Sequence, residues 1–210
     1  MMLCYHMSET KLMVFKVKDH YYKKAKENNY LARSIYKLEE IDQRYRILKS
    51  GDLVFDLGYY PGSWIQYTAK KIGKKGLTIG IDIQDINNKL SSLENVRLFK
   101  RDIFDLTSPA DLEIGRPADV VLSDMAPNTT GIRSVDQARS LNIVEQVFAI
   151  LPLLLRPGGN FVIKIFESAD AQNFIKGQRK SFEKLTALRP KSTRSISKEF
   201  FLIGLNYVSK

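Results

Sequence analysis

The segment at 54–64, V-F-D-L-G-Y-Y-P-G-S-W, constrains the fold of this chain more than any other. It runs from apolar residues to a carboxylate at Asp56, through a tight turn of glycine and proline, and into residues typical of a helix start. A buried strand that turns sharply into a helix is the first half of a nucleotide-binding βα unit. Such turns lie at the carboxyl ends of parallel strands, the edge where open α/β sheets bind ligands.

The same turn restricts the kind of ligand. Dinucleotide-binding folds need G-x-G-x-x-G, because the backbone must approach a pyrophosphate closely. Here Gly58 is followed by two tyrosines and a proline, which leave no glycine nest for a phosphate. The turn favours a ligand with an adenosine part and no pyrophosphate, and S-adenosylmethionine is the candidate. The alternative is a plain glycine turn between a core strand and a helix.

Composition bounds the class of protein. A chain of 210 residues suits one domain with a sizeable core, and its net charge of +10 indicates a polyanionic partner or a lysine-rich proteome. One cysteine, Cys4, and two histidines argue against a disulfide and a zinc site. The start of the chain lacks the apolar core of a signal peptide, and no stretch is long enough to span a membrane. We expect a cytoplasmic protein without a metal centre and, since nothing specifies an oligomer, a monomer.

Strand-like and helix-like segments alternate along the chain. Residues 1–18 have no clear period and are expected to be a partly disordered N-terminal segment before one domain at 19–210. Strands are predicted at 53–57, 77–83, 96–100, 118–124, 160–166 and 200–208. Helices are predicted at 31–42, 62–72, 135–155 and 169–186, the third ended by R-P-G-G at 156–159. This order predicts an α/β fold, with a largely parallel sheet covered by helices on both faces.

Carboxylates follow four of the predicted strands. Asp56, Asp82 and Asp102 end three of them, and S-D-M-A-P places Asp124 at the end of a fourth. In a parallel sheet these ends share one edge. An acid after the second strand can accept hydrogen bonds from both ribose hydroxyls of a nucleoside, which indicates Asp82, and Asp102 is placed to contact adenine. Any one of them alone would be interpreted as a helix cap or turn residue, but four on one edge favour a site.

Lys164 lies inside the apolar run F-V-I-K-I-F, which is predicted to be a central strand buried on both faces. A buried ammonium group needs a partner or a function, unless it reaches water from the strand end. Because the strand that ends at Asp124 is the expected neighbour, Lys164 and Asp124 are predicted to form an active-site pair. Taken alone, Lys37 and Glu199 look like solvated side chains.

Five segments carry a resemblance to a known family: A-R-S-I-Y-K-L-E-E-I-D, the turn at 54–64, L-S-D-M-A-P-N-T-T-G, L-R-P-G-G-N-F-V-I-K-I-F and S-K-E-F-F-L-I. From about Asp19 onward the chain resembles the FtsJ group of ribosomal RNA ribose 2′-O-methyltransferases. The resemblance implies a single Rossmann-like domain with a seven-stranded sheet that uses S-adenosylmethionine. It implies a catalytic tetrad of Lys37, Asp124, Lys164 and Glu199. The expected cofactor contacts are Gly58 of the turn together with Gly62, Trp64, Asp82, Asp102 and Asp124.

The turn departs from the family pattern D-L-G-x-A-P-G-G-W. Tyr59 and Tyr60 replace small residues, and Ser63 replaces the second glycine. A ring at position 60 would either crowd the methionine end of the cofactor or point away from it. In the implied mechanism, the amine of the strand at 160–166 is the base for the ribose hydroxyl and the acid of the S-D-M-A-P segment orients it. The other lysine of the tetrad would stabilise developing charge, and the glutamate would hold that lysine or the ribose.

Two basic stretches predict RNA binding with salt-sensitive affinity. The first interleaves tyrosines and comprises Lys16, Lys18, His20, Tyr21, Tyr22, Lys23, Lys24, Lys26, Tyr30 and Arg33. The second comprises Lys176, Arg179, Lys180, Lys184, Arg189, Lys191 and Arg194. The alternative for each is a solvated helix face. The resemblance implies a uridine of large-subunit ribosomal RNA as the target, and transfer RNA and messenger RNA caps are alternative substrates. Two other classes of protein stay open: a non-catalytic RNA-binding or ribosome-assembly factor, and a nicotinamide-dependent oxidoreductase.

Overall fold

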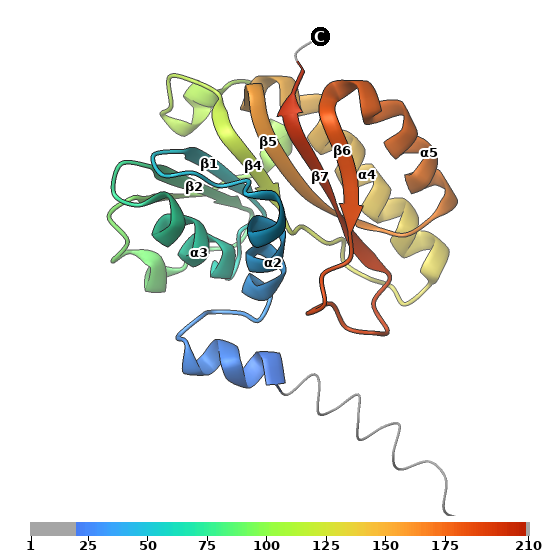
Figure 1. The fold of residues 1–210 in the computed structure, drawn as a ribbon, viewed down its shortest axis with the longest axis horizontal. Coiled ribbons are helices and arrows are strands. Elements are labelled where there is room, and N and C mark those ends of the chain that lie inside the picture. Colours follow the sequence, from blue (N-terminus) through green and yellow to red (C-terminus); the bar gives the residue numbers. More distant parts are fainter. Residues whose placement is uncertain (1–19, 209–210) are drawn as a thin grey trace, which may run out of the picture.

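The computed structural model describes residues 20–208 (Figure 1), so the prediction for residues 1–18 lies outside the described part of the chain. The strands are β1 (Leu53–Leu57), β2 (Leu77–Asp82), β3 (Val96–Lys100), β4 (Ala118–Ser123), β5 (Leu155–Phe166), β6 (Phe182–Leu188) and β7 (Glu199–Tyr207). The helices are α2 (Ile35–Tyr45), α3 (Ser63–Ile72), α4 (Arg133–Leu154) and α5 (Ala169–Gln178), with short 3₁₀ turns η1 (Asn88–Leu90), η2 (Ile103–Asp105), η3 (Pro109–Leu112) and η4 (Arg179–Ser181). A further helical segment covers 20–27.

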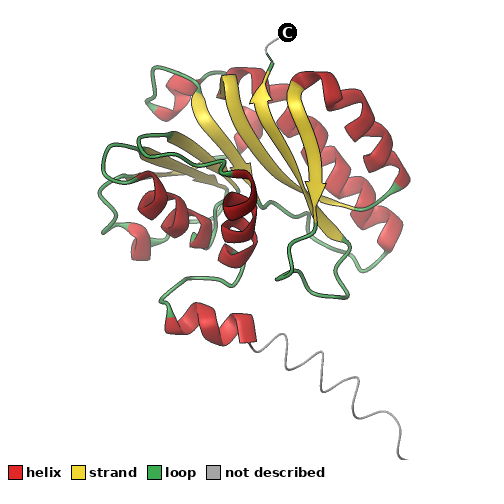
Figure 2. Cartoon of the chain, viewed as in Figure 1, coloured by secondary structure: helices red, strands yellow, loops and turns green. Residues whose placement is uncertain are grey.

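The seven strands form one sheet in the order β3-β2-β1-β4-β5-β7-β6, as the α/β prediction requires (Figure 2). Strands β1 to β5 are parallel, and β7 runs antiparallel to both β5 and β6. The order reverses direction at β1, because β2 follows on one side and β4 on the other. Open α/β sheets bind ligands at such a switch point, outside the carboxyl ends of the strands.

Alternating side chains of the strands build a core on each face of the sheet. Phe55 and its neighbours on one face pack against α4 and α5, and Val54 on the other packs against α2 and α3. Figure 1 shows the same layers, with α2 and α3 in front of the sheet and α4 behind it. All five residues of β1 are buried, so this strand holds the switch point rigidly at the centre of the molecule.

The predicted helix at 169–186 is wrong in its second half. Helix α5 ends at Gln178, and residues 182–188 form β6, an edge strand that the sequence prediction missed. Phe182 explains the difference, because its ring stacks on Phe161 of β5 at a centroid distance of 5.9 Å. Pairing with β7 along 182–188 outweighs the helical periodicity of a short basic segment.

The long helix ends just before R-P-G-G, at Leu154, as predicted, but the predicted start of the following strand at residue 160 is wrong. Strand β5 begins at Leu155 and includes these four residues, and its register with β4 shifts between Ala118 and Val120. A register irregularity accommodates the extra residues without ending the strand. The remaining predicted helices and strands are confirmed, with ends that differ by a few residues.

Candidate active site

The turn between β1 and α3 is shaped by two glycines with positive φ. Gly58 has a φ of +72°, and a Cβ there would lie 2.1 Å from Cγ of Met125. Gly62 has a φ of +111° and caps α3, and a Cβ there would lie 2.4 Å from Cδ1 of Leu90. A side chain at either position would combine backbone strain with a steric clash. The glycines therefore allow the turn to pass close to the carboxyl end of the sheet.

The two tyrosines of this turn point in different directions. Tyr59 is buried and packs with Ile65 and Leu90 beneath the turn, where it fills space between α3 and the sheet. Tyr60 is 52% exposed, and together with Tyr59 it lines a small cavity beside the turn. Its backbone N–H donates to the Asp82 carboxylate at 2.9 Å. The substitutions thus place two tyrosines in the wall of this cavity, at positions where the family pattern has small residues.

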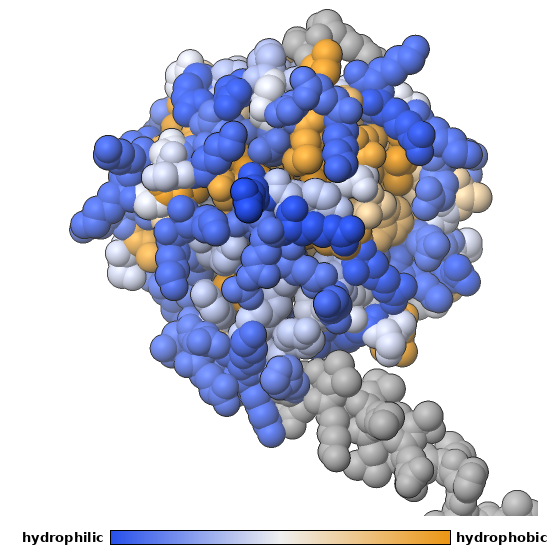
Figure 3. All heavy atoms as spheres, in the orientation of Figure 1, coloured by the Kyte–Doolittle hydropathy of each residue, from blue (hydrophilic) through white to orange (hydrophobic). Residues whose placement is uncertain are grey.

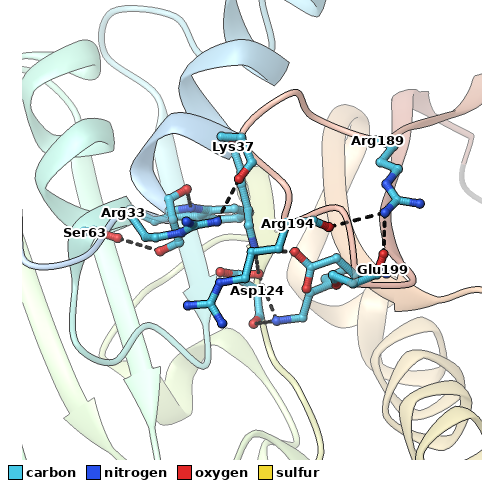
Figure 4. Close-up of polar contacts among 12 residues, drawn as sticks. Arg33, Lys37, Ser63, Asp124, Arg189, Arg194 and Glu199 are labelled. Carbon is cyan, nitrogen blue, oxygen red and sulfur yellow. Dashed lines mark hydrogen bonds and ion pairs between the residues drawn. The ribbon is translucent and has the colours of Figure 1, made fainter. Parts of the chain in front are cut away.

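Four charged side chains converge at the carboxyl edge of the sheet (Figure 4). Lys164 Nζ of β5 lies 2.9 Å from Oδ1 of Asp124, at the end of β4, and also donates to the Asp124 carbonyl. Lys37 Nζ of α2 lies 2.6 Å from Oε1 of Glu199 and 3.9 Å from Oδ1 of Asp124. Residues from four separate elements therefore meet in one network, as the sequence predicted for Lys164 and Asp124.

Burial strengthens the interactions in this network. The side chain of Lys37 is 12% exposed and that of Lys164 8%, although each belongs to a residue type that is normally solvated. Burial alone would raise the pKa of Glu199, but the ammonium of Lys37 outweighs it and holds that pKa below its ordinary value. Lys164 adds to this effect. Glu199 is therefore ionised at neutral pH and fixes the position of Lys37.

A small cavity of about 30 Å³ lies beside the network. It is lined by Ser34, Asp56, Gly58, Tyr59, Tyr60, Pro61, Ser63, Trp64 and Asp124. Asp56 is fully buried, and its Oδ2 has no hydrogen-bond partner in the described structure. Burial, and then the nearby carboxylates of Asp124 and Asp82, raise the pKa of Asp56 well above its ordinary value. A cavity of this volume holds only one or two groups the size of a water molecule, such as an ammonium group.

Asp82 and Asp102 lie further along this edge. Asp82 is the last residue of β2, and besides the Tyr60 amide it accepts the Gln84 N–H at 2.9 Å. A carboxylate has about four acceptor positions, so it retains capacity for two ribose hydroxyls. Asp102 is exposed and caps η2 by accepting the N–H of Phe104 at 3.0 Å. The helix-cap role considered for Asp102 is therefore present in the structure, and the residue is exposed at the carboxyl end of β3.

Two contacts near the cavity were missed by the sequence analysis. The indole N–H of Trp64 donates to the carbonyl of Ser34 at 2.9 Å, and the hydroxyls of Ser34 and Ser63 are 2.9 Å apart. Trp64 is also buried against Phe201 of β7, so it ties α3 to the chain before α2 and to the sheet. These contacts position the backbone that carries Lys37. No pattern in the sequence predicted these contacts, because they join residues about 30 positions apart in the chain.

The predicted basic stretches divide in the structure. Tyr21 and Tyr30 pack against Tyr36, whereas Tyr22 is 52% exposed and has Lys26 Nζ 4.9 Å from its ring centroid. In the second stretch, Arg189, Lys191 and Arg194 belong to the loop between β6 and β7 at the site edge; Lys176, Arg179 and Lys180 belong to α5 and η4, at the other end of β6. Lys16 and Lys18 lie outside the described residues.

Two searches of residues 20–208 bear on other classes of protein. No helix in this part of the chain combines the length and apolar character needed to cross a lipid bilayer. Across the same residues, His, Cys, Asp and Glu side chains form no group of three or more that could hold a metal ion.

Comparison with known proteins relates this geometry to characterised families. A family model described as FtsJ-like methyltransferase matches residues 30–207. Proteins named ribosomal RNA large subunit methyltransferase E are 43% identical in Bdellovibrio bacteriovorus, covering 92% of this chain and 99% of that one, and 45% identical in Oleidesulfovibrio alaskensis, covering 91% and 93%.

Solved structures show the same fold at lower identity. A Plasmodium falciparum protein described as a ribosomal RNA methyltransferase is 24% identical with a TM-score of 0.74, over 86% of this chain and all of that one. Aeropyrum pernix fibrillarin, solved with S-adenosyl-L-methionine bound, is 16% identical with a TM-score of 0.55, over 76% of this chain and 68% of that one.

The seven-stranded sheet and these structural neighbours define the fold class, which is that of Rossmann-like methyltransferases. Within that class the assignment is specific, since one family model spans most of the chain and relatives exceed 40% identity over nine-tenths of it. The chain belongs to the FtsJ-like methyltransferase family. The resemblance stated from the sequence is thereby confirmed.

The buried carboxyl of Asp56 leads to a prediction about stability and pH. In the unfolded chain an aspartate has a pKa of about 4, so between that value and the raised pKa of the folded state folding takes up a proton. The free energy of unfolding therefore falls as pH rises through this window. Asp56→Asn removes this proton linkage, and we expect the thermal midpoint of the variant relative to wild type to be about 3 °C more favourable at pH 8 than at pH 4.

Differential scanning fluorimetry without added cofactor measures this difference. Comparing the difference between variant and wild type at two pH values removes any effect of the amide on packing that does not depend on pH. The same difference between variant and wild type at both pH values would show that folding does not raise the pKa of Asp56.

Proposed function

We propose that this protein transfers a methyl group from S-adenosylmethionine to a ribose 2′-hydroxyl of large-subunit ribosomal RNA. The observation that carries the proposal is the network of Lys37, Asp124, Lys164 and Glu199 beside an acid-lined cavity at the switch point of the sheet. Removal of a proton from an alcohol requires a base, an acid that orients the base and a nearby cation, and the members of this network can supply all three.

The residues of the cavity fit this cofactor. S-adenosylmethionine carries positive charge on its sulfonium and its amino group, and the carboxyl groups of Asp56 and Asp124 both line the cavity. Asp56 Oδ2 is a buried acceptor without a partner, which a bound ammonium group would satisfy. Asp82 would hold the ribose hydroxyls and Asp102 the adenine, with Gly58, Gly62 and Trp64 forming the wall of the methionine end.

When bound, the cofactor supplies an electrophilic methyl group. Lys164, in its neutral form, accepts the proton of the 2′-hydroxyl, and Asp124 orients its amine through the 2.9 Å contact. Lys37 Nζ is held by Glu199 and stabilises negative charge that develops on the ribose oxygen. Positioning of the two reacting groups supplies a large part of the rate, so the rigidity of β4 and β5 contributes directly.

Names of the relatives support ribosomal RNA of the large subunit as the substrate. The basic loop at 189–198 and the exposed Tyr22 support an RNA partner on the edge where the network lies. We propose a uridine as the methylated nucleotide and the cytoplasm as the site of action, in keeping with the family resemblance, with the protein working as a monomer.

Isothermal titration calorimetry with S-adenosylmethionine tests the cofactor part of this proposal. An enzyme of the proposed kind should bind the cofactor with a measurable heat and a 1:1 stoichiometry. A non-catalytic RNA-binding or assembly factor should show no heat. Absence of binding by a folded protein would overturn the proposed function.

A further inference from the structure

The two basic stretches of the sequence meet at one point in the structure. Arg33 lies just before α2 and Arg194 in the loop between β6 and β7, 161 positions later in the chain. Figure 4 shows Arg194 reaching across the opening of the site toward the side from which Arg33 comes. The two residues also interact electrostatically, since burial and then the positive charge of Arg194 lower the pKa of Arg33. Two guanidinium groups therefore flank the entrance to the site.

The loop that carries Arg194 is held in place at several points. Arg33 Nη2 donates to the carbonyl of Ser192 at 2.9 Å, and the amide of Lys191 donates to the carboxylate of Glu40 on α2 at 2.8 Å. The guanidinium of Arg189 donates to three carbonyls of the same loop, including that of Arg194. Arg194 is thus presented from a fixed backbone, although its side chain is exposed.

Charge at this opening is not balanced. The carboxylates of Asp124 and Glu199 pair with Lys37 and Lys164. Within residues 20–208, the guanidinium groups of Arg33 and Arg194 form no ion pair with a carboxylate. Their positive charges are therefore not neutralised by contact, and Glu199 only partly offsets the effect of Arg194 and of burial on Arg33. A bound anion would relieve it.

We propose that Arg33 and Arg194 form a clamp for one backbone phosphate of the substrate RNA, next to the ribose that receives the methyl group. This inference rests on the proposed function. A phosphodiester accepts the planar donors of guanidinium groups, and two arginines on opposite sides of an opening can hold one phosphate between them. The clamp places the strand at the rim, so that the adjacent ribose reaches Lys164 below it.

The surroundings of the clamp favour an extended nucleic acid strand. In Figure 3, hydrophilic side chains cover the lower part of this face, whereas apolar groups gather in its upper half. The exposed ring of Tyr60 belongs to the turn that lines the cavity, where it can stack on an unpaired base. An acidic protein segment would use the charge but not this ring.

Arg194→Gln tests the clamp, with Arg97→Gln as the matched control, because Arg97 is an exposed arginine on β3 that belongs to neither basic stretch. Binding is measured by fluorescence anisotropy on a mixed-sequence single-stranded 12-nucleotide RNA between 50 and 300 mM salt, a range over which the Debye length falls from roughly 14 to 6 Å. We expect Arg194→Gln to weaken binding about tenfold and to make the slope of log affinity against log salt shallower by about 0.7, while Arg97→Gln matches wild type.

Steady-state methylation of large ribosomal subunits from a strain lacking the gene provides the second readout. A phosphate contact is the same in the ground state and the transition state, so Arg194→Gln should raise KM about tenfold and leave kcat within about twofold. If the wild-type protein is active and the two variants have the same KM and the same salt slope, the clamp is overturned but the proposed function is not. Inactive wild type would overturn the proposed function, and the anisotropy result would then decide the phosphate site. Equal competition by poly-glutamate and RNA would also contradict the clamp.

Discussion

Lys164→Ala is expected to lower the rate of methyl transfer at least about a hundredfold while leaving affinity for S-adenosylmethionine within about threefold of wild type. Lys164 is the group placed to remove the hydroxyl proton, and its amine is held at 2.9 Å from Asp124 on a buried strand. Single-turnover transfer of a labelled methyl group, together with calorimetry, separates chemistry from binding.

The control for this variant is Lys75→Ala, which removes an exposed lysine from the turn between α3 and β2 and should retain full activity. Removing Lys164 leaves the Asp124 carboxylate without its closest cation, so thermal unfolding must show that the variant is folded. Lys164→Met preserves most of the side-chain volume and should behave as Lys164→Ala does. A folded variant that keeps more than a tenth of wild-type turnover would remove Lys164 as the base.

Asp82→Ala has the opposite expected profile. Loss of a carboxylate that accepts two ribose hydroxyls should weaken cofactor binding about a hundredfold, or about 2.7 kcal/mol, with a smaller effect on the rate at saturating cofactor. Part of the loss comes from the turn, because Asp82 also accepts the Tyr60 amide. Calorimetry and the dependence of initial rate on cofactor concentration measure the two effects.

Asp85→Ala is the matched control for Asp82, three residues away. The Asp85 carboxylate is 91% exposed and pairs with Lys100 at 2.6 Å, so its removal should not change cofactor affinity. Asp82→Asn keeps one carbonyl acceptor and should fall between wild type and Asp82→Ala. Unchanged affinity in Asp82→Ala would mean that the cofactor does not use the end of β2.

The sequence was sufficient for the centre of the fold because the determinants there are local. An apolar run followed by a glycine turn predicted β1 and α3. The apolar run around Lys164 predicted β5, with β4 as its expected neighbour. The pairing of Lys164 with Asp124 followed from the rule that parallel strands end at one edge. Lys37 and Glu199 had no such local signal, and only the family resemblance indicated them.

The parts that could not be predicted depend on contacts between distant segments. Strand β6 exists because Phe182 stacks on Phe161 and the segment pairs with β7, whereas its composition alone suited a helix. The approach of Arg33 to Arg194 depends on how the loop at 189–198 folds over α2. Asp56 Oδ2 is buried without a hydrogen-bond partner, and this can be recognised only when the positions of the surrounding side chains are known.

Mapping ribose methylation in ribosomal RNA tests the central claim most directly. Large-subunit RNA is compared between cells with the wild-type gene, cells with the Lys164→Ala variant and cells lacking the gene, by mass spectrometry of nuclease digests. We expect one 2′-O-methylated nucleotide, a uridine, to be present in the first strain and absent from the other two. An identical ribose-methylation pattern in all three strains would contradict the assignment of this protein as a ribosomal RNA ribose methyltransferase.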